Sequence, residues 1–168
     1  MRYRQYVDTE IGKLCLAVED GCLVELSRRK AEQAHNCEVE SEKHMTEADV
    51  EFRDAKLLAQ AVVQLQEYLA GTRTSFDIPI CGKGTEFQQK VWKALCDIPY
   101  GETRTYGQIA EAIGNPKASR AVGGACNKNP IMIMVPCHRV IGGNGRLVGF
   151  GGGLDMKEWL LGLERAIR

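Results

Sequence analysis

A short segment rich in proline and glycine, Ile78 to Gly84, separates two parts of the chain that follow different patterns. Before it, apolar and polar residues alternate over short runs, whereas after it apolar residues recur at helical spacing. The length of 168 residues leaves open one compact unit or two small domains. The change of pattern favours two, and we predict an α/β (α+β) protein with domains at residues 1–80 and 81–168.

The first part predicts a sheet and a helix. Three runs alternate as strands do: Arg2–Val7, Gly12–Glu19 and Cys22–Leu26. Asp20-Gly21 between two of them indicates a hairpin turn. Arg28 to Asp49 is polar and without period, which predicts a loop or marginal structure. A helix from about Val50 to Gly71 follows from one apolar face, made of Leu58, Val62, Leu65 and Leu69.

The second part begins with helices. Thr85 can cap the first, whose apolar side carries Phe87, Val91, Trp92 and Leu95. Thr105 can cap a short second helix that ends at Gly114. Asn115 and Pro116 suit the start of a third, Lys117–Cys126. Two short helices joined by Gly-Asn-Pro predict a helix-turn-helix.

Small residues dominate the segment Lys117–Cys126, where Lys117 and Arg120 are the long polar side chains. Glycine inside a helix costs about 0.5 to 1 kcal/mol relative to alanine, so Gly123 and Gly124 need a compensating reason. Close approach to DNA is one reason, and tight packing in a protein core is the other. Composition alone leaves both open.

A buried strand over Ile131–Val135, stopped by Pro136, is the expected support for Cys137. A glycine-rich stretch, residues 142–153, follows; it matches neither a Walker loop nor a G-x-G-x-x-G fingerprint, so we expect no nucleotide cofactor. The last helix, with Asp155 as its cap, carries an apolar stripe of Met156, Trp159, Leu160, Leu163 and Ile167.

The net charge of zero conceals an asymmetry. Residues 1–80 contain 10 Lys+Arg and 15 Asp+Glu, and residues 81–168 contain 12 and 7, so the two parts carry −5 and +5. A basic second part supports contact with a polyanion such as nucleic acid.

Seven cysteines are scattered without a Cys-x-x-Cys pair, which argues against a disulfide framework and a compact zinc site. A cysteine that reacts must be activated by its surroundings, and Cys137 is followed by His138 and Arg139.

No stretch approaches the roughly 18 apolar residues of a membrane span, and the start of the chain has no signal-peptide pattern. We expect an intracellular protein: cytoplasmic, or nuclear if the source is a eukaryote.

The second part resembles the O6-alkylguanine-DNA alkyltransferases, also called methylated-DNA-protein-cysteine methyltransferases. The resemblance runs from about Phe87 to Leu163, and its central motif is Asn129-Pro130, an apolar run, and Pro136-Cys137-His138-Arg139-Val140. Other matching motifs occur in the same order: Val91-Trp92, Ile98-Pro99-Tyr100-Gly101, Thr105-Tyr106, Gly114-Asn115-Pro116, residues 120–125, Gly152-Gly153-Leu154 and Lys157-Glu158-Trp159-Leu160.

The resemblance implies roles for residues at the reacting centre. Cys137 would be the alkyl acceptor, and His138, held by Glu164, would activate it through a water. Tyr106 would donate a hydrogen bond to guanine N3, and Asn129 would brace the segment through backbone hydrogen bonds. Residues expected to line the base pocket are Tyr106, Val140, Phe150 and Gly151.

Double-stranded DNA is the implied partner. A buried thiol cannot reach O6 of guanine in a duplex, so the nucleotide must be flipped out, and Arg120 would fill the vacated place. The second helix of the helix-turn-helix, Lys117–Cys126, would enter the minor groove. The residues expected to contact DNA are Arg120, Lys117, Ala118, Ser119, Ala121 and Gly123. A thioether does not hydrolyse, so each monomer would act once, without a cofactor. Activity on O4-alkylthymine stays open.

The resemblance is looser in the first part. It implies a ribonuclease-H-like domain of a sheet and a helix there, and a mainly helical second domain. Some relatives bind zinc in the first domain, but Cys15, Cys22 and His35 do not fall at the corresponding places, so we expect no metal. Phe150 and Gly151 stand where some relatives have tyrosine and serine, which leaves pocket width open. The sequence leaves three alternative functions: a non-enzymatic binder of alkylated DNA, a helix-turn-helix transcription factor, and a cysteine hydrolase. Cys137 disfavours the first, and the few base-reading side chains disfavour the second. Multiple turnover on a thioester would support the third.

Overall fold

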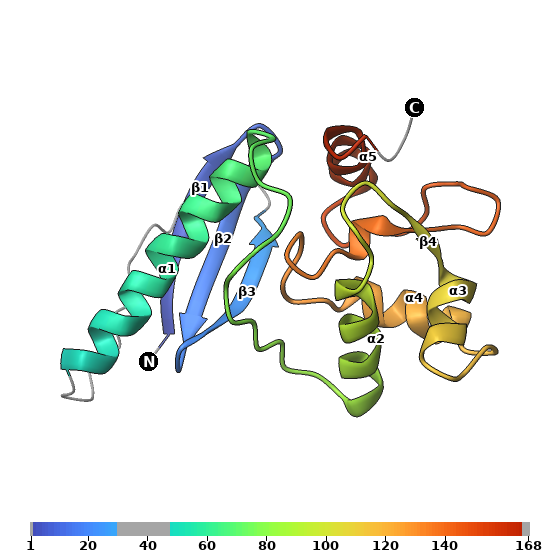
Figure 1. Ribbon diagram of the computed structural model, residues 1–168, viewed down its shortest axis with the longest axis horizontal. Coiled ribbons are helices and arrows are strands. Elements are labelled where there is room, and N and C mark those ends of the chain that lie inside the picture. The colour runs from blue at the N-terminus through green and yellow to red at the C-terminus, as the bar shows by residue number, and fades with distance from the viewer. Residues whose placement is uncertain (1, 30–47, 166–168) are drawn as a thin grey trace. The chain divides into compact units, whose positions relative to one another are not determined.

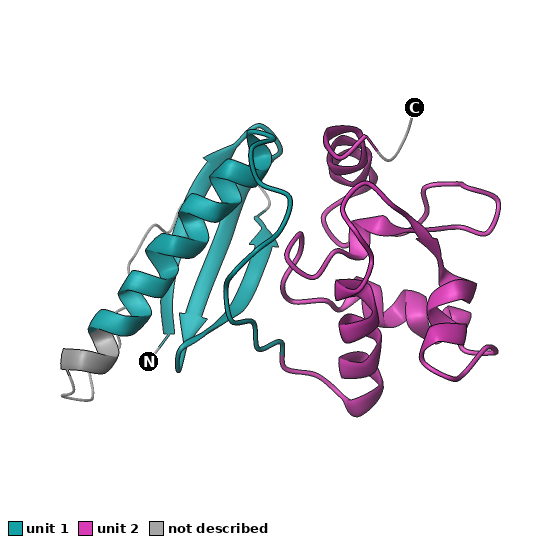
Figure 2. Cartoon of the chain, viewed as in Figure 1, with its two compact units in different colours: residues 1–82 teal, residues 83–168 magenta. Residues whose placement is uncertain are grey.

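The computed structural model describes residues 2–29 and 48–165, and the chain forms two compact units, residues 1–82 and 83–168 (Figures 1 and 2). The division falls after Gly82, close to the boundary predicted after Ile80. Most of the loop predicted between Arg28 and Asp49 lies outside the described residues. Within the described part of the chain, none of the helices combines the length and the apolar character needed to cross a bilayer.

Unit 1 is an antiparallel sheet with a helix packed on it (Figure 1). The sheet has the order β1-β2-β3, with β1 at Arg2–Thr9, β2 at Gly12–Glu19 and β3 at Cys22–Arg28. Asp20 and Gly21 have φ values of 50° and 76°, the left-handed conformation that a tight hairpin turn requires. The predicted strands and turn are therefore confirmed.

The helix of unit 1, α1, spans Ala48–Leu69. Leu58, Val62 and Leu65 are buried as predicted, but Leu69 is only half-buried and Tyr68 is fully buried instead. Asp54 is 2% exposed and its carboxylate accepts a hydrogen bond from the Gly21 amide at 2.9 Å. This bond attaches the helix to the hairpin turn.

A disulfide between Cys22 and Cys81 corrects the expectation drawn from the scattered cysteines. The amide of Leu23 donates to the carbonyl of Pro79 at 2.8 Å, and the amide of Cys81 donates to the carbonyl of Leu23 at 2.9 Å. These bonds bring the two sulfur-bearing residues within 5.6 Å at their Cα atoms, although 59 positions separate them in the sequence. Sequence spacing alone does not disclose such a pairing.

Unit 2 consists mainly of helices. They are α2 (Glu86–Cys96), α3 (Tyr106–Ala112), α4 (Ser119–Asn127) and α5 (Leu154–Leu163), with the short 3-10 helix η2 at Cys137–Arg139. Thr85 and Thr105 form capping boxes with Gln88 and Gln108, which confirms the two predicted caps. The indole of Trp92 on α2 donates to the carbonyl of Ala125 on α4 at 2.9 Å and ties the two helices together.

Two predicted helix starts are wrong by a few residues. Asn115 and Pro116 belong to a turn, in which the Asn115 carbonyl accepts from the Ala118 amide at 3.0 Å, so α4 begins at Ser119. Helix α5 follows Gly153, whose φ of 102° suits glycine, and Asp155 lies in its first turn rather than at its cap. Its stripe is also shifted: Leu161 is buried, Trp159 and Leu163 are half-buried, and Ile167 lies outside the described residues.

Candidate active site

The segment before Cys137 is a compact turn, not the strand that its apolar sequence predicted. Its residues from Ile131 to Val135 are all buried, but Ile133 has a φ of 71°. The Met134 amide donates to the Met132 carbonyl at 2.8 Å, which closes a γ-turn around Ile133. Burial on every side looks the same in a sequence whether the backbone is extended or folded, so the apolar run misled the prediction.

Asn129 holds this turn from both ends. Its Nδ2 donates to the carbonyl of Val135 at 2.8 Å, and its Oδ1 accepts from the amide of Ile131 at 3.0 Å. The Cys137 amide then donates to the Val135 carbonyl at 2.8 Å, and η2 follows. The position of Cys137 is thus fixed by side-chain and backbone bonds within one short segment.

Cys137 is buried, with 4% of the residue exposed. Burial raises its pKa to about 11, while a hydrogen bond from Asn129, the charge of Lys157 and the backbone amides of Cys137 and His138 act in the opposite direction. The resting thiol is protonated at neutral pH. A reaction at this sulfur therefore needs a base.

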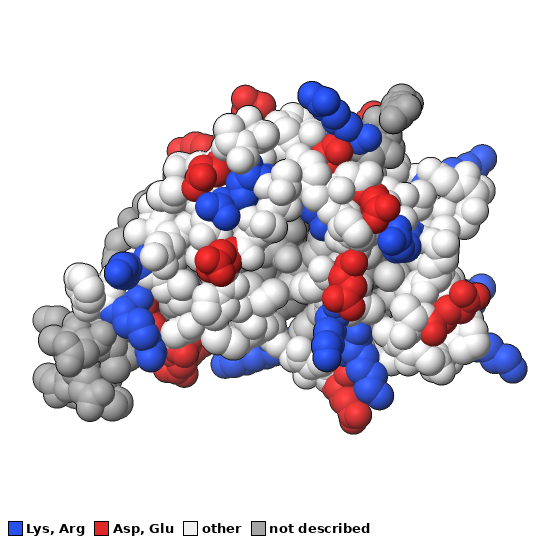
Figure 3. All heavy atoms as spheres, viewed as in Figure 1, with Lys and Arg blue, Asp and Glu red and all other residues white. Residues whose placement is uncertain are grey.

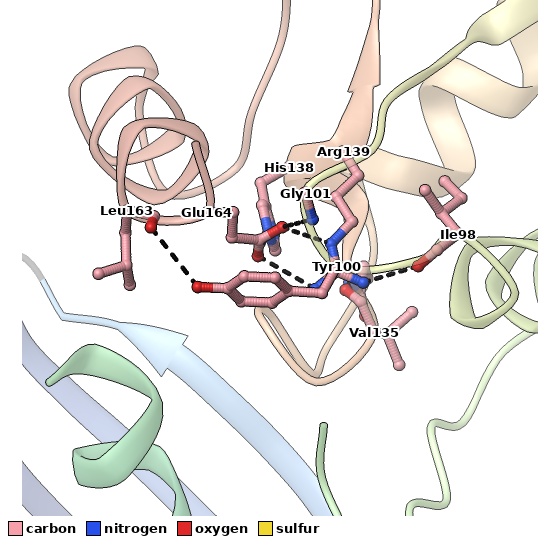
Figure 4. Close-up of polar contacts among 9 residues, drawn as sticks. Ile98, Tyr100, Gly101, Val135, His138, Arg139, Leu163 and Glu164 are labelled. Atoms are coloured by element: carbon pink, nitrogen blue, oxygen red, sulfur yellow. Dashed lines mark hydrogen bonds and ion pairs between the residues drawn. The ribbon is translucent and has the colours of Figure 1, made fainter. Parts of the chain in front are cut away.

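His138 and Glu164 lie in contact, although 26 positions separate them. The imidazole Nε2 is 2.7 Å from Oε2 of Glu164, and both side chains are fully buried (Figure 4). Burial lowers the pKa of His138, an effect opposed by Glu164. The imidazole is neutral at neutral pH, and its Nε2–H is directed at the carboxylate, so Nδ1 is the nitrogen able to accept a proton.

Arg139 binds the same carboxylate. Its Nε donates to Oε1 of Glu164 at 2.7 Å and its Nη2 to Oε2 at 3.1 Å, while Nη1 donates to the Ile98 carbonyl at 2.7 Å (Figure 4). The Gly101 amide donates to Oε1 at 3.3 Å, and the Tyr100 ring lies 5.7 Å from the guanidinium. Glu164 at the end of α5 is therefore the hub of a buried polar cluster.

Tyr106 lies at the start of α3, beside the segment that carries Cys137. Strands β4 (Arg104–Thr105) and β5 (Val140–Ile141) pair in parallel, with Arg104 opposite Val140, and this pairing brings the start of α3 to the end of η2. The Tyr106 hydroxyl donates to the Val148 carbonyl at 2.8 Å. Burial raises the pKa of Tyr106 to about 12, so the hydroxyl remains a donor at physiological pH.

Lys157 on α5 is fully buried and was not among the predicted site residues. Its ammonium donates to the Val140 carbonyl, to that of Val148 at 3.2 Å and to that of Gly149 at 3.3 Å, and it lies 5.9 Å from the Tyr106 ring centre. These bonds connect the glycine-rich loop to Val140, which follows the short helix that carries Cys137. The available signal was its place in the matching motif Lys157-Glu158-Trp159-Leu160.

Of the predicted pocket residues, Val140 is buried, Phe150 is half-buried and Gly151 is exposed. Neighbouring Gly152 is the crowded position: a Cβ there would lie 2.7 Å from the Met156 sulfur, 2.9 Å from the Phe150 ring and 3.1 Å from the Met132 sulfur. The structure therefore places Phe150 close to two thioethers, and glycine at 152 makes that approach possible.

Helix α4 presents a surface without acidic residues. Arg120, Ala121 and Gly124 are exposed, as is Lys117 just before the helix, and Ala118, Ser119 and Gly123 are half-buried. A Cβ at Gly124 would meet no atom within 4 Å. Close packing inside the protein therefore does not explain this glycine. On the face seen in Figure 3, by contrast, basic and acidic side chains are interspersed.

The described residues contain no group of three or more His, Cys, Asp or Glu side chains that could hold a metal ion. His35, one of the residues considered as a zinc ligand, lies outside the described ranges. The absence of zinc therefore stays a prediction.

Two family models match the chain. The ribonuclease-like domain of 6-O-methylguanine DNA methyltransferase matches residues 1–81, and the DNA binding domain of the same family matches residues 86–166. Together they cover nearly the whole chain.

Relatives and solved structures agree with this match. A methylated-DNA–protein-cysteine methyltransferase of Methanosarcina acetivorans is 49% identical over 96% of this chain and 97% of its own, and one of Mycolicibacterium paratuberculosis is 52% identical over 95% and 90%. The Mycobacterium tuberculosis OGT structure in complex with DNA has a TM-score of 0.77 at 47% identity, over 97% of this chain and 92% of that one. The chain therefore belongs to the 6-O-methylguanine DNA methyltransferase family, the methylated-DNA–protein-cysteine methyltransferases of DNA repair.

Proposed function

We propose that Cys137 takes the alkyl group from O6 of an alkylated guanine in double-stranded DNA, once per protein molecule. The observation that carries this proposal is the buried Cys137, followed directly by a buried His138 whose Nε2 contacts Glu164 at 2.7 Å. This arrangement supplies a nucleophile and the base that it needs. The half-buried Tyr106 hydroxyl provides a proton donor close by.

The reaction begins with removal of the Cys137 proton. Nδ1 of His138 accepts it through a water, and Glu164 stabilises the imidazolium that forms. The thiolate then attacks the alkyl carbon, a carbon–sulfur bond forms, and the bond from that carbon to O6 breaks. The electron pair goes to the guanine, where a hydrogen bond from Tyr106 to N3 stabilises the leaving base. The thioether product is not hydrolysed, so the transfer is irreversible and stoichiometric.

DNA would bind as a duplex through its minor groove to one monomer. The acid-free surface of α4 supports this, because Lys117 can pair with a phosphate while Ala121 and Gly124 allow close approach. Flipping exposes O6 to the buried thiol at a cost of a few kcal/mol, and Arg120 would occupy the vacated place in the stack.

Mass spectrometry tests the proposal directly. Incubation with a duplex that contains one O6-methylguanine should add a single methyl group to Cys137 and saturate at one per chain. Cys137→Ser should lose the transfer and keep DNA binding, and Cys126→Ala is the matched control that keeps both. A duplex with O4-methylthymine in the same assay decides whether that base is also a substrate. An unchanged mass for the reduced protein would contradict the proposal and leave binding of alkylated DNA as the function.

A further inference from the structure

Arg139 and His138 share one buried carboxylate, that of Glu164. The two oxygens of Glu164 receive two guanidinium bonds, at 2.7 and 3.1 Å, and Oε2 also faces the imidazole at 2.7 Å. Arg139 is 7% exposed and Glu164 is 3% exposed. Because a guanidinium keeps its charge at any physiological pH, Arg139 always offsets part of the negative charge that Glu164 presents to His138.

We propose that Arg139 is a positioning residue that sets the basicity of His138 by pairing with Glu164, so that the imidazole stays neutral and able to accept the proton of Cys137. The inference rests on the proposed role of His138 as the base. It gives Arg139 a role in the reaction beyond that of a structural ion pair with Glu164.

The geometry gives Arg139 several contacts that fix it in place. Its third nitrogen is held by the Ile98 carbonyl at 2.7 Å, and its flat guanidinium faces the Tyr100 ring. The two bonds to Glu164 are of the bidentate type that lysine cannot reproduce. A side chain held at three nitrogens cannot swing away, so its charge stays next to the carboxylate throughout the reaction.

The charged and titratable groups around His138 come from several elements. Glu164 and Lys157 face His138 from α5, and Arg139 and Cys137 belong to η2, as His138 does. Arg139 is in turn faced by Tyr100 and Cys96, near the end of α2. Burial lowers the pKa of His138, Glu164 raises it, and Arg139 and Lys157 lower it. Without Arg139, the negative charge of Glu164 would be less compensated. Glu164 would then stabilise the imidazolium form of His138 more strongly.

The experiment follows His138 directly by NMR titration of its imidazole in the whole chain, together with the pH dependence of single-turnover methyl transfer. Arg139→Met keeps the apolar stem and removes the charge, and Arg139→Lys keeps the charge with fewer bonds. With Arg139→Met we expect the midpoint of His138 to rise by about one pH unit or more, and transfer on the acid side to slow about tenfold. Arg139→Lys should restore most of the midpoint.

A double variant shows whether Arg139 acts through Glu164. With Glu164→Gln in the background, Arg139→Met should shift the His138 midpoint far less than it does alone. An unchanged midpoint in folded Arg139→Met would overturn the inference, as would an equal shift with and without Glu164. The NMR titration needs no substrate. A wild-type protein that leaves the O6-methylguanine of its substrate methylated would therefore refute the proposed function, while the role of Arg139 is still measured.

Discussion

The hydroxyl of Tyr106 donates a hydrogen bond to the backbone carbonyl of Val148 at 2.8 Å. Lys157 donates to the same oxygen at 3.2 Å, so one carbonyl of the glycine-rich loop receives both groups. If Tyr106 donates to guanine N3 during repair, its hydroxyl must leave Val148, while Lys157 can keep the loop in place. The resting bond therefore holds the proton donor beside the place where the base would enter.

Tyr106→Phe is expected to slow methyl transfer about a hundredfold, because the leaving base loses its hydrogen-bond donor. The free energy of unfolding should fall by about 1 kcal/mol, since Lys157 still donates to the carbonyl that Tyr106 abandons. Single-turnover rates and urea unfolding measure the two effects. The pKa of about 12 keeps the hydroxyl protonated, so the rate ratio of wild type to variant should stay constant from about pH 6 to 9. A ratio that varies across this range would argue against proton donation by Tyr106.

The buried thiols should make the protein less stable in alkaline solution. Burial raises the pKa of Cys126 to about 12 and that of Cys137 to about 11, from 9.0 in an exposed thiol. Because the folded pKa exceeds the unfolded value, the stabilisation is complete below pH 9 and is lost as pH rises toward 11 to 12. The loss approaches about 1.4 kcal/mol per pH unit for each thiol. Urea unfolding from pH 8 to 10.5 should show it, and Cys126→Ala should make the decline less steep; an equal slope in that variant would refute the assignment.

Arg120→Ala should impair repair of duplex DNA more than reaction with the free base O6-methylguanine. The side chain is exposed, so we expect the free energy of unfolding to change by less than about 0.5 kcal/mol. Rates on the two substrates, measured side by side, give the comparison. Lys90→Ala on α2 removes the same charge from an exposed site and serves as control. Equal losses on both substrates would count against the role of Arg120 in flipping.

Gly124→Ala separates the two explanations of the glycines in α4. A Cβ at this position meets nothing within 4 Å, so the variant should gain about 0.5 to 1 kcal/mol of stability as a helix interior residue. Its affinity for duplex DNA should fall, since the added methyl group points out of the exposed surface. Thermal unfolding and fluorescence anisotropy check the two parts. Higher stability with unchanged DNA affinity would mean that DNA does not approach α4 at Gly124.

Local chemistry made part of this fold predictable. The turn at Asp20-Gly21 and the caps at Thr85 and Thr105 depend on residues close in sequence, and all three are where the pattern indicated. The contact between His138 and Glu164 was expected through the family resemblance, since 26 positions separate the pair.

The wrong predictions arose from features of the fold that a sequence pattern does not show. The run Ile131–Val135 is buried on all sides, and burial does not reveal that Ile133 turns the backbone. Asn115 and Pro116 suit a helix start, but the Asn115 carbonyl closes a turn with Ala118 first. The disulfide of Cys22 with Cys81 depends on tertiary pairing. The roles of Arg139 and Lys157 likewise depend on which carbonyls and carboxylates the fold brings to them.

The left-handed Ile133 also bears on inhibitor design. A branched residue in this conformation costs about 1 to 3 kcal/mol, and the closed γ-turn, the burial of its side chain and the two Asn129 bonds offset that cost. The turn around Ile133 therefore has little freedom to adapt to the shape of a ligand. Compounds that discriminate between this protein and its relatives should therefore draw their selectivity from the loop of residues 142–153.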